Sequence, residues 1–455
     1  MPDGSLFGEV FGHSAVDVSD AAWLQAMLDT EAALARALER AGLAAPGAGA
    51  AVTAAARAER FDVATLGEAT ALTGNPVPAL ARELAAALPA SAAAAVHRGA
   101  TSQDIVDTAM MLLAATALDV IRTQASAAAD AAAQLAAAHT DTIMTGRTLL
   151  QQAVPVTFGL VAAGWLTGLD EAVAALARVR TERLAVQFGG AAGTLAPLGT
   201  DGPRVAALLA AELGLTEPVL PWHTARLRIV ELAAALAGLA AAAGKIARDV
   251  TLLAQTEVAE VREGGGVDRG GSSTMPHKRN PVAAIAILGC TRQAPGLLAT
   301  LAAAAEQEHQ RAAGAWHAEW QPLASLLRLT GSAAAWCAEL LGGLEVDAAA
   351  MRASLDAARG LPLAERAAAV LAPRLGRAAA HDLLARASAT AVTSGRPLRD
   401  TLRAELAASG VDIPARDIDA ALDPAGYLGA AAVFVQRALA AHYRSTRSPG
   451  RRAGP

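Results

Sequence analysis

The sequence predicts an all-α protein built around long helices that form an elongated bundle. Apolar residues recur at helical spacing through most of the chain, and no alternating apolar–polar segment is long enough to predict a strand. Hydrophobic residues make up 53% of the 455 residues, but aromatic residues make up only 3%, so the excess is mainly alanine, a strong helix former. Several predicted helices are longer than about thirty residues, which favours a long bundle over a compact globule.

The predicted helices follow one another between breaks that contain glycine and proline, the residues that most often end regular structure. These breaks lie at residues 42–49, 189–203 and 264–276. A quieter boundary near residues 346–355 precedes shorter helices. The main helices are expected at about residues 20–42, 76–88, 104–138, 154–186, 224–260, 281–306 and 318–343.

These boundaries divide the chain into three helical domains and a tail. The segments are an N-terminal helical domain at residues 1–100, a central long-helix bundle at residues 101–345, a C-terminal helical domain at residues 346–444 and a tail at residues 445–455. The tail is rich in serine, glycine, proline and arginine, so we expect it to be disordered, with its arginines in water.

The bulk properties exclude several classes of partner. The net charge of −5, with 18% charged residues, gives no electrostatic reason to expect binding to nucleic acid or to a membrane surface. Cys290 and Cys337 form neither a disulfide framework nor a C-x-x-C metal pair. No secretory signal is visible in residues 1–20, and the apolar run at residues 232–244 is too short to span a bilayer. We therefore expect a soluble, cytoplasmic protein.

One segment carries most of the chemical information. Residues 270–282 read G-G-S-S-T-M-P-H-K-R-N-P-V and interrupt the alanine-rich pattern with hydroxyls and with the charge of Lys278. Asn280 and Pro281 fit an N-cap and the first residue of a helix. Because a helix N-terminus carries partial positive charge and free N–H groups, it attracts carboxylates. A surface loop ahead of an ordinary helix is the alternative interpretation.

Two further polar segments each precede a predicted bundle helix. Residues 97–108 read H-R-G-A-T-S-Q-D-I-V-D-T, in which Thr101 and Ser102 are small donors at the start of a long helix. A capping group, with serine or threonine followed by an acid, is the simpler interpretation of that pattern. Residues 146–153 read G-R-T-L-L-Q-Q-A and are predicted to start another bundle helix, with a solvated Arg147 as the simpler interpretation.

Two other segments combine histidine, tryptophan and arginine. Residues 220–228 read L-P-W-H-T-A-R-L-R, and Arg226 is expected either to meet a carboxylate or to lie on an ordinary helix face. Residues 308–320 read E-H-Q-R-A-A-G-A-W-H-A-E-W. Trp316 and Trp320 are four residues apart, so a packed stripe on one helix explains them most simply.

Taken together, these segments resemble a known enzyme family. The string G-S-S-x-M-P-x-K-x-N-P resembles the signature of the fumarase/aspartase superfamily. The strings T-S-Q-D-I-V-D-T-A, G-R-T-L-L-Q-Q, P-W-H-T and G-x-W-H-A-E-W are similar to its 3-carboxy-cis,cis-muconate cycloisomerase branch. The resemblance extends from about residue 6 to about residue 443.

The resemblance implies a fold, an assembly and a reaction. The subunit would have three all-α domains and form a homotetramer with a twenty-helix core, in which each active site is shared between subunits. In the reaction, a carboxylate oxygen of 3-carboxy-cis,cis-muconate adds to the diene and closes a lactone through an aci-carboxylate. This step belongs to the protocatechuate branch of the β-ketoadipate pathway. The substrate is a small polycarboxylate, and no metal or organic cofactor is implied because the substrate carboxylates activate the carbon acid.

The resemblance also assigns residues. Ser272 and Lys278 match the catalytic positions of the family. Substrate binding is implied for His97, Thr101, Ser102, Arg147, Thr148, Gln151, His223, Arg226, Ser273, Met275, Asn280, Arg311 and Trp316. Trp222 or Trp316 is expected to form an apolar wall beside a planar substrate.

The sequence departs from the family pattern at two positions. Leu149 stands where adenylosuccinate lyases carry a histidine that is assigned general-acid work, and Leu227 stands where relatives often carry an acidic residue. A leucine cannot donate a proton, which disfavours adenylosuccinate as substrate. A lyase that cleaves C–N or other C–X bonds of a substituted succinate stays open. A non-catalytic scaffold, as in some lens crystallins, is disfavoured by the intact set of Ser272, Lys278 and Asn280.

Overall fold

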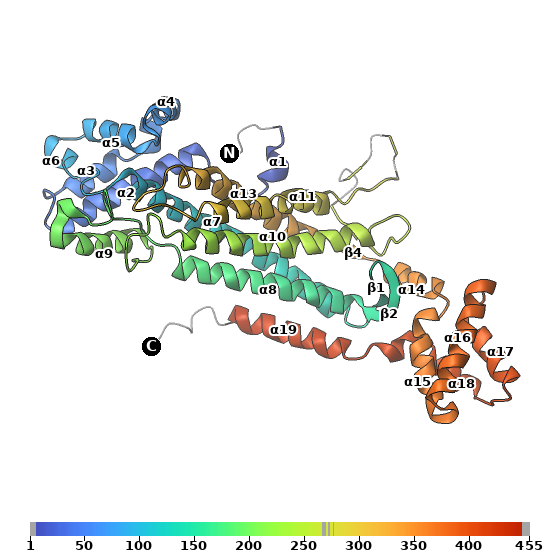
Figure 1. Cartoon of the computed structure of the whole chain (residues 1–455). Coiled ribbons are helices and arrows are strands. Elements are labelled where there is room, and N and C mark those ends of the chain that lie inside the picture. The colour runs from blue at the N-terminus through green and yellow to red at the C-terminus, as the bar shows by residue number, and fades with distance from the viewer. Residues whose placement is uncertain (1–5, 266–269, 272–273, 276, 448–455) are drawn as a thin grey trace. The chain divides into compact units, whose positions relative to one another are not determined.

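The computed structural model describes residues 6–265, 270–271, 274–275 and 277–447. It is 68% helical, and the all-α prediction is confirmed (Figure 1). The predicted helices near residues 20–42, 76–88, 104–138 and 318–343 agree with observed helices to within a few residues.

The chain forms two compact units. Unit 1 consists of Met1–Ser126, Glu171–Gly244 and Ala286–Cys337, and unit 2 consists of Ala127–Asp170, Lys245–Ile285 and Ala338–Pro455. The units interleave along the chain because several long helices contain residues of both. The predicted division at residues 100 and 345 does not coincide with these units and stays a prediction.

Five helices contain or adjoin the boundaries between the units. They are α7 (Ser102–Ala138), α8 (Phe158–Glu182), α10 (Leu227–Leu253), α11 (Val282–Thr291) and α13 (Trp320–Gly342). The helix predicted at residues 281–306 is in fact two helices, α11 and α12 (Ala294–Ala303). Pro295 explains the break, because a proline lacks the N–H of a helix interior and its ring clashes with the carbonyl four residues earlier.

The rest of unit 1 consists of one longer helix and a set of shorter elements. They are α1 (Gly8–Phe11), α2 (Asp20–Arg40), α3 (Ala48–Ala55), η1 (Ala58–Arg60), α4 (Val63–Thr73), α5 (Val77–Ala86), α6 (Ala90–Ala93), η2 (Ala196–Asp201), α9 (Gly202–Leu213) and η3 (His317–Glu319). The Ser19 hydroxyl caps α2 by accepting the Ala22 N–H. One face of α2, with Leu24 and Leu28, lies in a core shared with α3, α5 and α7, and another face packs on α9.

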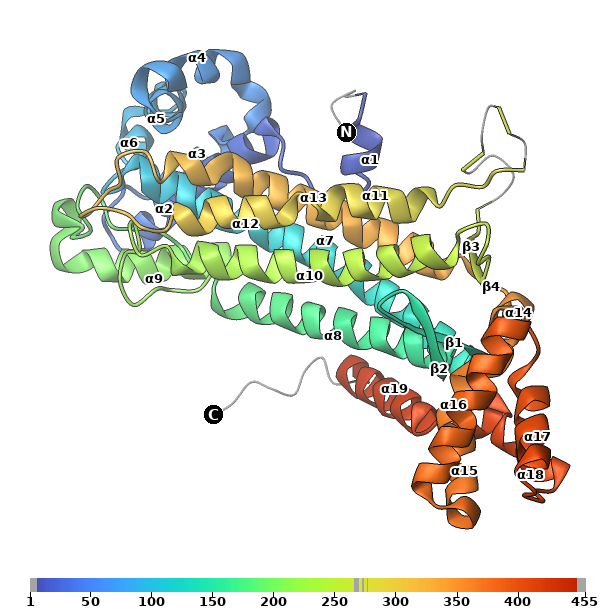
Figure 2. The ribbon, with the colours of Figure 1, turned by 45° about the vertical axis from the view of Figure 1, so that its right-hand side comes forward.

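Unit 2 contains two small antiparallel ladders and a separate helical core. Its elements are β1 (Ile143–Thr148), β2 (Gln151–Thr157), β3 (Val261–Glu263), β4 (Leu344–Val346), α14 (Ala348–Ala357), η4 (Leu361–Leu363), α15 (Ala364–Leu375), α16 (Arg377–Ser394), α17 (Leu398–Ala408), α18 (Ala415–Ala421), η5 (Pro424–Tyr427) and α19 (Ala431–Arg447). Buried leucines and alanines of α15 to α18, with Leu363, Ile418 and Leu422, form that core. Figure 2 shows these helices grouped together. The last helix extends three residues into the predicted disordered tail, and residues 448–455 lie outside the described residues.

The segment around Arg147 corrects a prediction. It was predicted to start a bundle helix, but it forms the hairpin β1–β2, which contacts α14 (Figure 2). Thr148 pairs with Gln151, and the two turn residues Leu149 and Leu150 both have positive φ, 51° and 64°. Two-residue hairpin turns of this kind normally use Asn-Gly, so a Leu-Leu turn gives no recognisable signal. The following helix α8 consequently begins at Phe158.

Three helical stretches are more apolar than the sequence analysis expected. Phe158–Glu182, Leu227–Leu253 and Val282–Ala303 are long and apolar enough, by length and composition alone, to cross a membrane. Between 39% and 44% of their most apolar windows is buried within the chain. The other residues of these windows are partly or fully exposed, and the exposed large apolar side chains among the three stretches are Leu227, Val282 and Ile285.

Candidate active site

A buried carboxylate fixes the turn that carries Thr101 and Ser102 in unit 1. Asp104 is 0% exposed, and its two oxygens accept the backbone N–H groups of Thr101, Gly189 and Gly190 at 2.8–3.0 Å. The capping interpretation is thus correct in part, because Asp104 caps the start of α7. The same carboxylate holds more than its own helix, since two of its donors come from a distant loop.

Asp104 accepts backbone N–H groups and does not bond to the hydroxyls of Thr101 and Ser102. Thr101 and Ser102 are half-buried at the start of α7, and within the described part of the chain neither hydroxyl makes a hydrogen bond. His223 is nearly buried, and its Nε2 lies 2.7 Å from the Asp104 carboxylate. The two small hydroxyls beside this fixed turn can bind a carboxylate, as predicted for Thr101 and Ser102. His223 is nearly buried and its Nε2 faces Asp104, so its contact with a substrate stays a prediction.

Arg226 corrects a prediction, because it pairs with the protein rather than with a substrate. Its side chain is 0% exposed. It donates two hydrogen bonds to Asp107 at 2.6 and 3.0 Å, and its Nε donates to Glu319 at 3.0 Å. Burial alone would lower the pKa of Arg226, but the charge of Asp107 and the hydrogen bonds of both carboxylates outweigh it and raise that pKa. The guanidinium therefore joins α7, η3 and the start of α10.

The two tryptophans proposed as a substrate wall are core residues. Trp316 is 4% exposed, and its indole N–H donates to Asp107 at 2.9 Å. It packs edge-to-face on Trp320 with ring centroids 4.9 Å apart, which confirms the packed-stripe interpretation. Trp222 is 3% exposed and lies under the Arg226 guanidinium. The predicted contact of Trp316 with a substrate is therefore corrected to a packing role.

His97 precedes the same turn and is held by a residue that the sequence analysis did not select. Its backbone N–H and its ring Nδ1 lie 2.8 and 2.7 Å from the two carboxylate oxygens of Glu31 on α2. Arg311 approaches from another loop and donates to the side chain of Gln103 and to the carbonyl of Ala191. Unit 1 thus brings His97, Thr101, Ser102, His223 and Arg311 into one constellation.

The remaining predicted residues lie in unit 2. Arg147 on β1 makes a two-pronged ion pair with the buried Glu260, so it is not the solvated arginine of the simpler interpretation. Thr148 and Gln151 are exposed at the end of the hairpin, where Leu149 is 97% exposed. These residues belong to unit 2, and their contact with a substrate stays a prediction.

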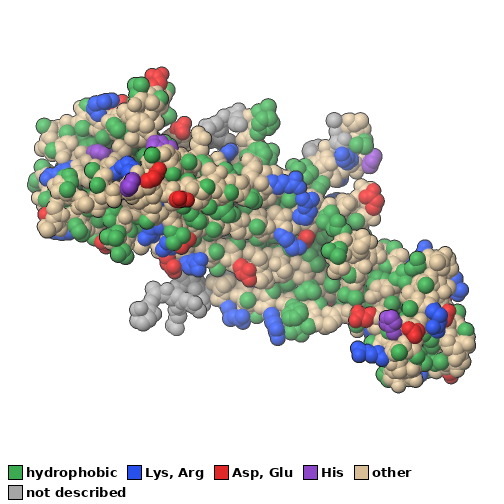
Figure 3. All heavy atoms as spheres, viewed as in Figure 1, with side chains coloured by type: hydrophobic (Ala, Val, Ile, Leu, Met, Phe, Trp, Pro, Cys, Tyr) green, Lys and Arg blue, Asp and Glu red, His purple; other side chains and the backbone are tan. Residues whose placement is uncertain are grey.

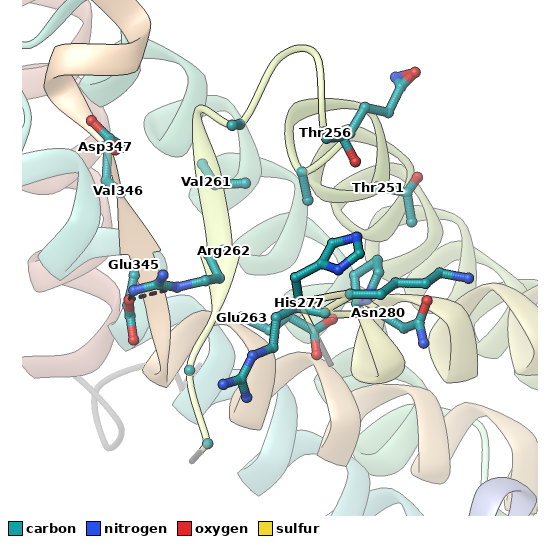
Figure 4. A pocket seen from close by; sticks show the side chains of 18 of the residues that line it. Thr251, Thr256, Val261, Arg262, Glu263, His277, Asn280, Glu345, Val346 and Asp347 are labelled. Carbon is teal, nitrogen blue, oxygen red and sulfur yellow. Dashed lines mark hydrogen bonds and ion pairs between the residues drawn. The ribbon is translucent and has the colours of Figure 1, made fainter. Parts of the chain in front are cut away.

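The signature segment lines a cavity of about 1140 Å³ in unit 2 (Figure 4). Met275, His277, Lys278 and Asn280 border it, and Figure 4 shows His277 and Asn280 on the side of Thr251, opposite the Arg262–Glu345 ion pair. Ser272 and Ser273 lie outside the described residues, and so do residues 266–269 and 276. Three carboxylates also line the cavity, but each has a partner in the protein: Glu345 pairs with Arg262, Glu263 accepts N–H groups of α11, and Asp347 accepts the Ala350 N–H. The lysine and amide donors of the signature segment are therefore the groups there that suit an anionic ligand.

Short contacts hold the base of the signature segment. The Asn280 N–H and side-chain amide both donate to the Gly270 carbonyl, at 2.9 and 3.0 Å. Gly270 has φ of 70°, and a Cβ there would lie 2.2 Å from the Asn280 carbonyl oxygen, so only glycine fits. This pairing closes the loop where it meets α11.

The start of α11 differs from its prediction. The helix begins at Val282 rather than at Pro281, and the N–H groups of Ala283 and Ala284 donate to the carboxylate of Glu263 at 3.0 and 2.9 Å. The helix N-terminus does attract a carboxylate, as its dipole dictates, but that carboxylate belongs to the protein. Asn280 and Lys278 are therefore the better candidates for contact with a substrate.

Sequence reasoning missed the acids that position these residues. They are the buried Glu31, Asp107, Glu260 and Glu319 and the half-buried Glu263. A charged residue within a stripe of alanine and leucine, as at Glu31, was the available signal, but it does not identify the partner. In the described part of the chain, no group of three His, Cys, Asp or Glu residues could hold a metal ion.

Comparison with known proteins gives consistent matches over most of the chain. The family described as "Lyase" matches residues 13–296, and the family described as "Adenylosuccinate lyase C-terminus" matches residues 360–438. A 3-carboxy-cis,cis-muconate cycloisomerase of Bradyrhizobium diazoefficiens is 48% identical over 92% of this chain and 94% of its own. A nitrosuccinate lyase of Streptomyces davaonensis is 47% identical over 96% of this chain and 94% of its own.

A solved structure agrees with these matches. The crystal structure of a 3-carboxy-cis,cis-muconate lactonizing enzyme from Pseudomonas putida superposes with a TM-score of 0.91 at 45% identity. The superposition covers 97% of this chain and 99% of that enzyme.

The Arg226 cluster generates a test of stability. Replacing Arg226 by methionine should lower the free energy of unfolding by about 3–5 kcal/mol, because two buried carboxylates lose their cation. Arg228→Met is the matched control, since Arg228 is only half-buried and donates to the carbonyl of Arg183. Denaturant unfolding at neutral pH measures both variants, and equal midpoints would contradict the assignment.

The same variant should respond to pH. Burial raises the pKa of Glu319 even though Arg226 partly lowers it. Without the arginine, folding favours the protonated acid more strongly. The stability lost in Arg226→Met should therefore shrink as the pH falls towards the pKa of an unfolded glutamate.

Proposed function

Because the chain belongs to the lyase family of the fumarase/aspartase superfamily, we propose that it is an enzyme that converts 3-carboxy-cis,cis-muconate to a carboxymuconolactone. High identity to cycloisomerases over nearly the full length carries this proposal. The intact Lys278 and Asn280 beside an anion-compatible cavity support it. The same residues count against a non-catalytic scaffold.

The reaction consumes one proton and one negative charge. A substrate carboxylate oxygen forms a C–O bond to the diene, and the displaced π electrons move towards a neighbouring carboxylate as an aci-carboxylate. A proton then adds to the carbon that lies between the new C–O bond and this carboxylate. The trianionic substrate thereby becomes a dianionic lactone. The enzyme must hold three carboxylates, stabilise the dianionic aci-carboxylate and deliver that proton.

Each requirement has candidate residues. Lys278 and Asn280 would stabilise the aci-carboxylate, while Thr101, Ser102, Thr148 and Gln151 would bind the other carboxylates. Ser272 is proposed to move the proton. A serine hydroxyl is a poor acid and base, so Ser272 needs backbone N–H groups and the charge of Lys278 to stabilise its alkoxide.

A second candidate function is elimination of nitrite from nitrosuccinate, and the identity to a nitrosuccinate lyase favours it specifically. Nitrite leaves as a stable anion, so cleavage of that C–N bond needs no proton donor at the leaving group. Lactone formation releases no leaving group, so it needs no proton donor of that kind either. Leu149 is therefore compatible with both reactions and disfavours only poorer leaving groups such as the amine of adenylosuccinate.

We propose that the protein is a cytoplasmic homotetramer with shared active sites. The incompletely buried faces of α8, α10 and the α11–α12 stretch need a partner, and Figure 3 shows apolar side chains reaching the surface over much of the visible face. The exposed Leu149 lies at the tip of the hairpin that carries Thr148 and Gln151. Copies of the same chain would cover these surfaces. Each active site would then combine residues of unit 1 from one subunit with residues of unit 2 from another.

A panel of three substrates tests the function. Purified protein should turn over 3-carboxy-cis,cis-muconate at least a hundredfold faster, in kcat/KM, than adenylosuccinate, a ratio worth about 2.7 kcal/mol in transition-state binding. Loss of the diene absorbance follows the first reaction, and release of nitrite follows the reaction of nitrosuccinate. A preference for adenylosuccinate would refute the cycloisomerase proposal, and a preference for nitrosuccinate would establish the second candidate.

Lys278→Ala should lower kcat/KM by more than about tenfold, because the lysine charge is used most strongly as the aci-carboxylate forms. Lys245→Ala is a matched control, since Lys245 is the other lysine of the chain and pairs with Asp249 on α10. Steady-state kinetics on both variants give the comparison. Equal rates for the two variants would make Lys278 an ordinary surface charge.

Light scattering should give the mass of a tetramer at micromolar concentration. The physical reason is the apolar helix surface that one subunit leaves uncovered. An active monomer would contradict both the assembly and the shared site.

A further inference from the structure

His97 is held in a conformation that its own backbone disfavours. Its φ is 57°, in the left-handed region that residues other than glycine rarely occupy. Such a residue persists only when its surroundings hold it firmly, and strained residues concentrate at functional sites. Glu31 supplies the anchor, because its carboxylate accepts both the backbone N–H and the ring Nδ1 of His97.

The anchor also determines which ring nitrogen faces outward. An ionised carboxylate only accepts hydrogen bonds, so Nδ1 carries a proton and donates it to Glu31. Nε2 makes no hydrogen bond to any described residue, and the side chain is 27% exposed. Glu31 itself is 0% exposed, so its charge acts on the ring with little screening by water.

From this geometry we propose that Glu31 is a positioning residue that keeps the His97 ring protonated, so that its Nε2–H donates to a carboxylate of the substrate. The inference rests on the proposed function, because it assumes a polycarboxylate ligand. It deepens that function by naming the group that sets the charge of one anion-binding residue. Glu31 lies on α2, and in the sequence it is outside every motif that the sequence analysis selected.

The charges around His97 act in the same direction. Burial by itself lowers the pKa of His97, but the hydrogen bond and charge of Glu31, with the charge of Asp104 on α7, outweigh it and raise that pKa. His223 faces Asp104 rather than His97, and the Arg98 guanidinium donates to the carbonyl of Leu43. The imidazolium is therefore favoured below the raised pKa and is lost as the pH rises through it.

The test measures binding of an unreactive tricarboxylate, tricarballylate, by calorimetry over about pH 5.5–8.5, the range in which histidine titrates. Wild-type affinity should fall as the pH rises through the pKa of His97. In Glu31→Gln the carboxylate charge is gone while the His97 ring stays buried, so the affinity for tricarballylate should fall at lower pH than in the wild type. Binding at neutral pH should be about tenfold weaker. Asp29→Asn, which removes an exposed charge from the same helix, should follow the wild type.

A purely structural role for Glu31 gives a different result. It would weaken binding by the same factor at every pH, and an unshifted pH dependence in Glu31→Gln overturns the inference. If that variant does not fold, His97→Gln serves instead: it should remove the pH-dependent part of the affinity, and retention of the wild-type profile overturns the inference. A wild-type protein that binds no tricarballylate at any pH also overturns it.

The outcome is separable from that of the proposed function. Binding of tricarballylate requires no turnover. A wild-type protein with the expected pH profile but no activity on 3-carboxy-cis,cis-muconate would refute the proposed reaction and leave the role of Glu31 intact.

Discussion

Ionised carboxylates buried among alanine-rich helices are the constraint on which the local geometry of both units depends. An uncompensated buried charge costs several kcal/mol, so each carboxylate must collect donors wherever the chain can supply them. Asp104 collects three backbone N–H groups, and Asp107 and Glu319 share one arginine. Because alanine gives little side-chain interlocking, these directional bonds determine where the connecting loops lie.

This constraint divides the cationic and polar groups into two sets. One set is bonded within the protein. Arg226 pairs with Asp107 and Glu319, Arg147 pairs with Glu260, and the first N–H groups of α11 donate to Glu263. The other set keeps capacity for a ligand, including the hydroxyls of Thr101 and Ser102. An enzyme for a polycarboxylate needs both sets, because acids that hold the frame would otherwise compete with the substrate for the same donors.

The same alanine content bears on the proposed assembly. A helix rich in alanine allows close approach of neighbouring helices but buries little area in each contact. Fewer than half of the residues in the most apolar windows of α8, α10 and the α11–α12 stretch are buried within the chain. By length and composition those helical stretches satisfy the criterion for a membrane span. The proposed packing between copies of the chain would cover the exposed parts of these helices while keeping their polar ends available for chemistry.

What the sequence by itself determined is the helical fold, most helix positions and the identity of the polar segments. Helical periodicity and short motifs are local properties, so they survive without knowledge of the partner segments. The hairpin at Leu149–Leu150 was missed because its strained turn lacks the residues that usually announce one. Only the tertiary structure decided that Arg226 and Trp316 belong to the interior and that Glu31 holds His97. Those outcomes depend on which distant side chain compensates a buried charge, and spacing along the chain does not encode that pairing.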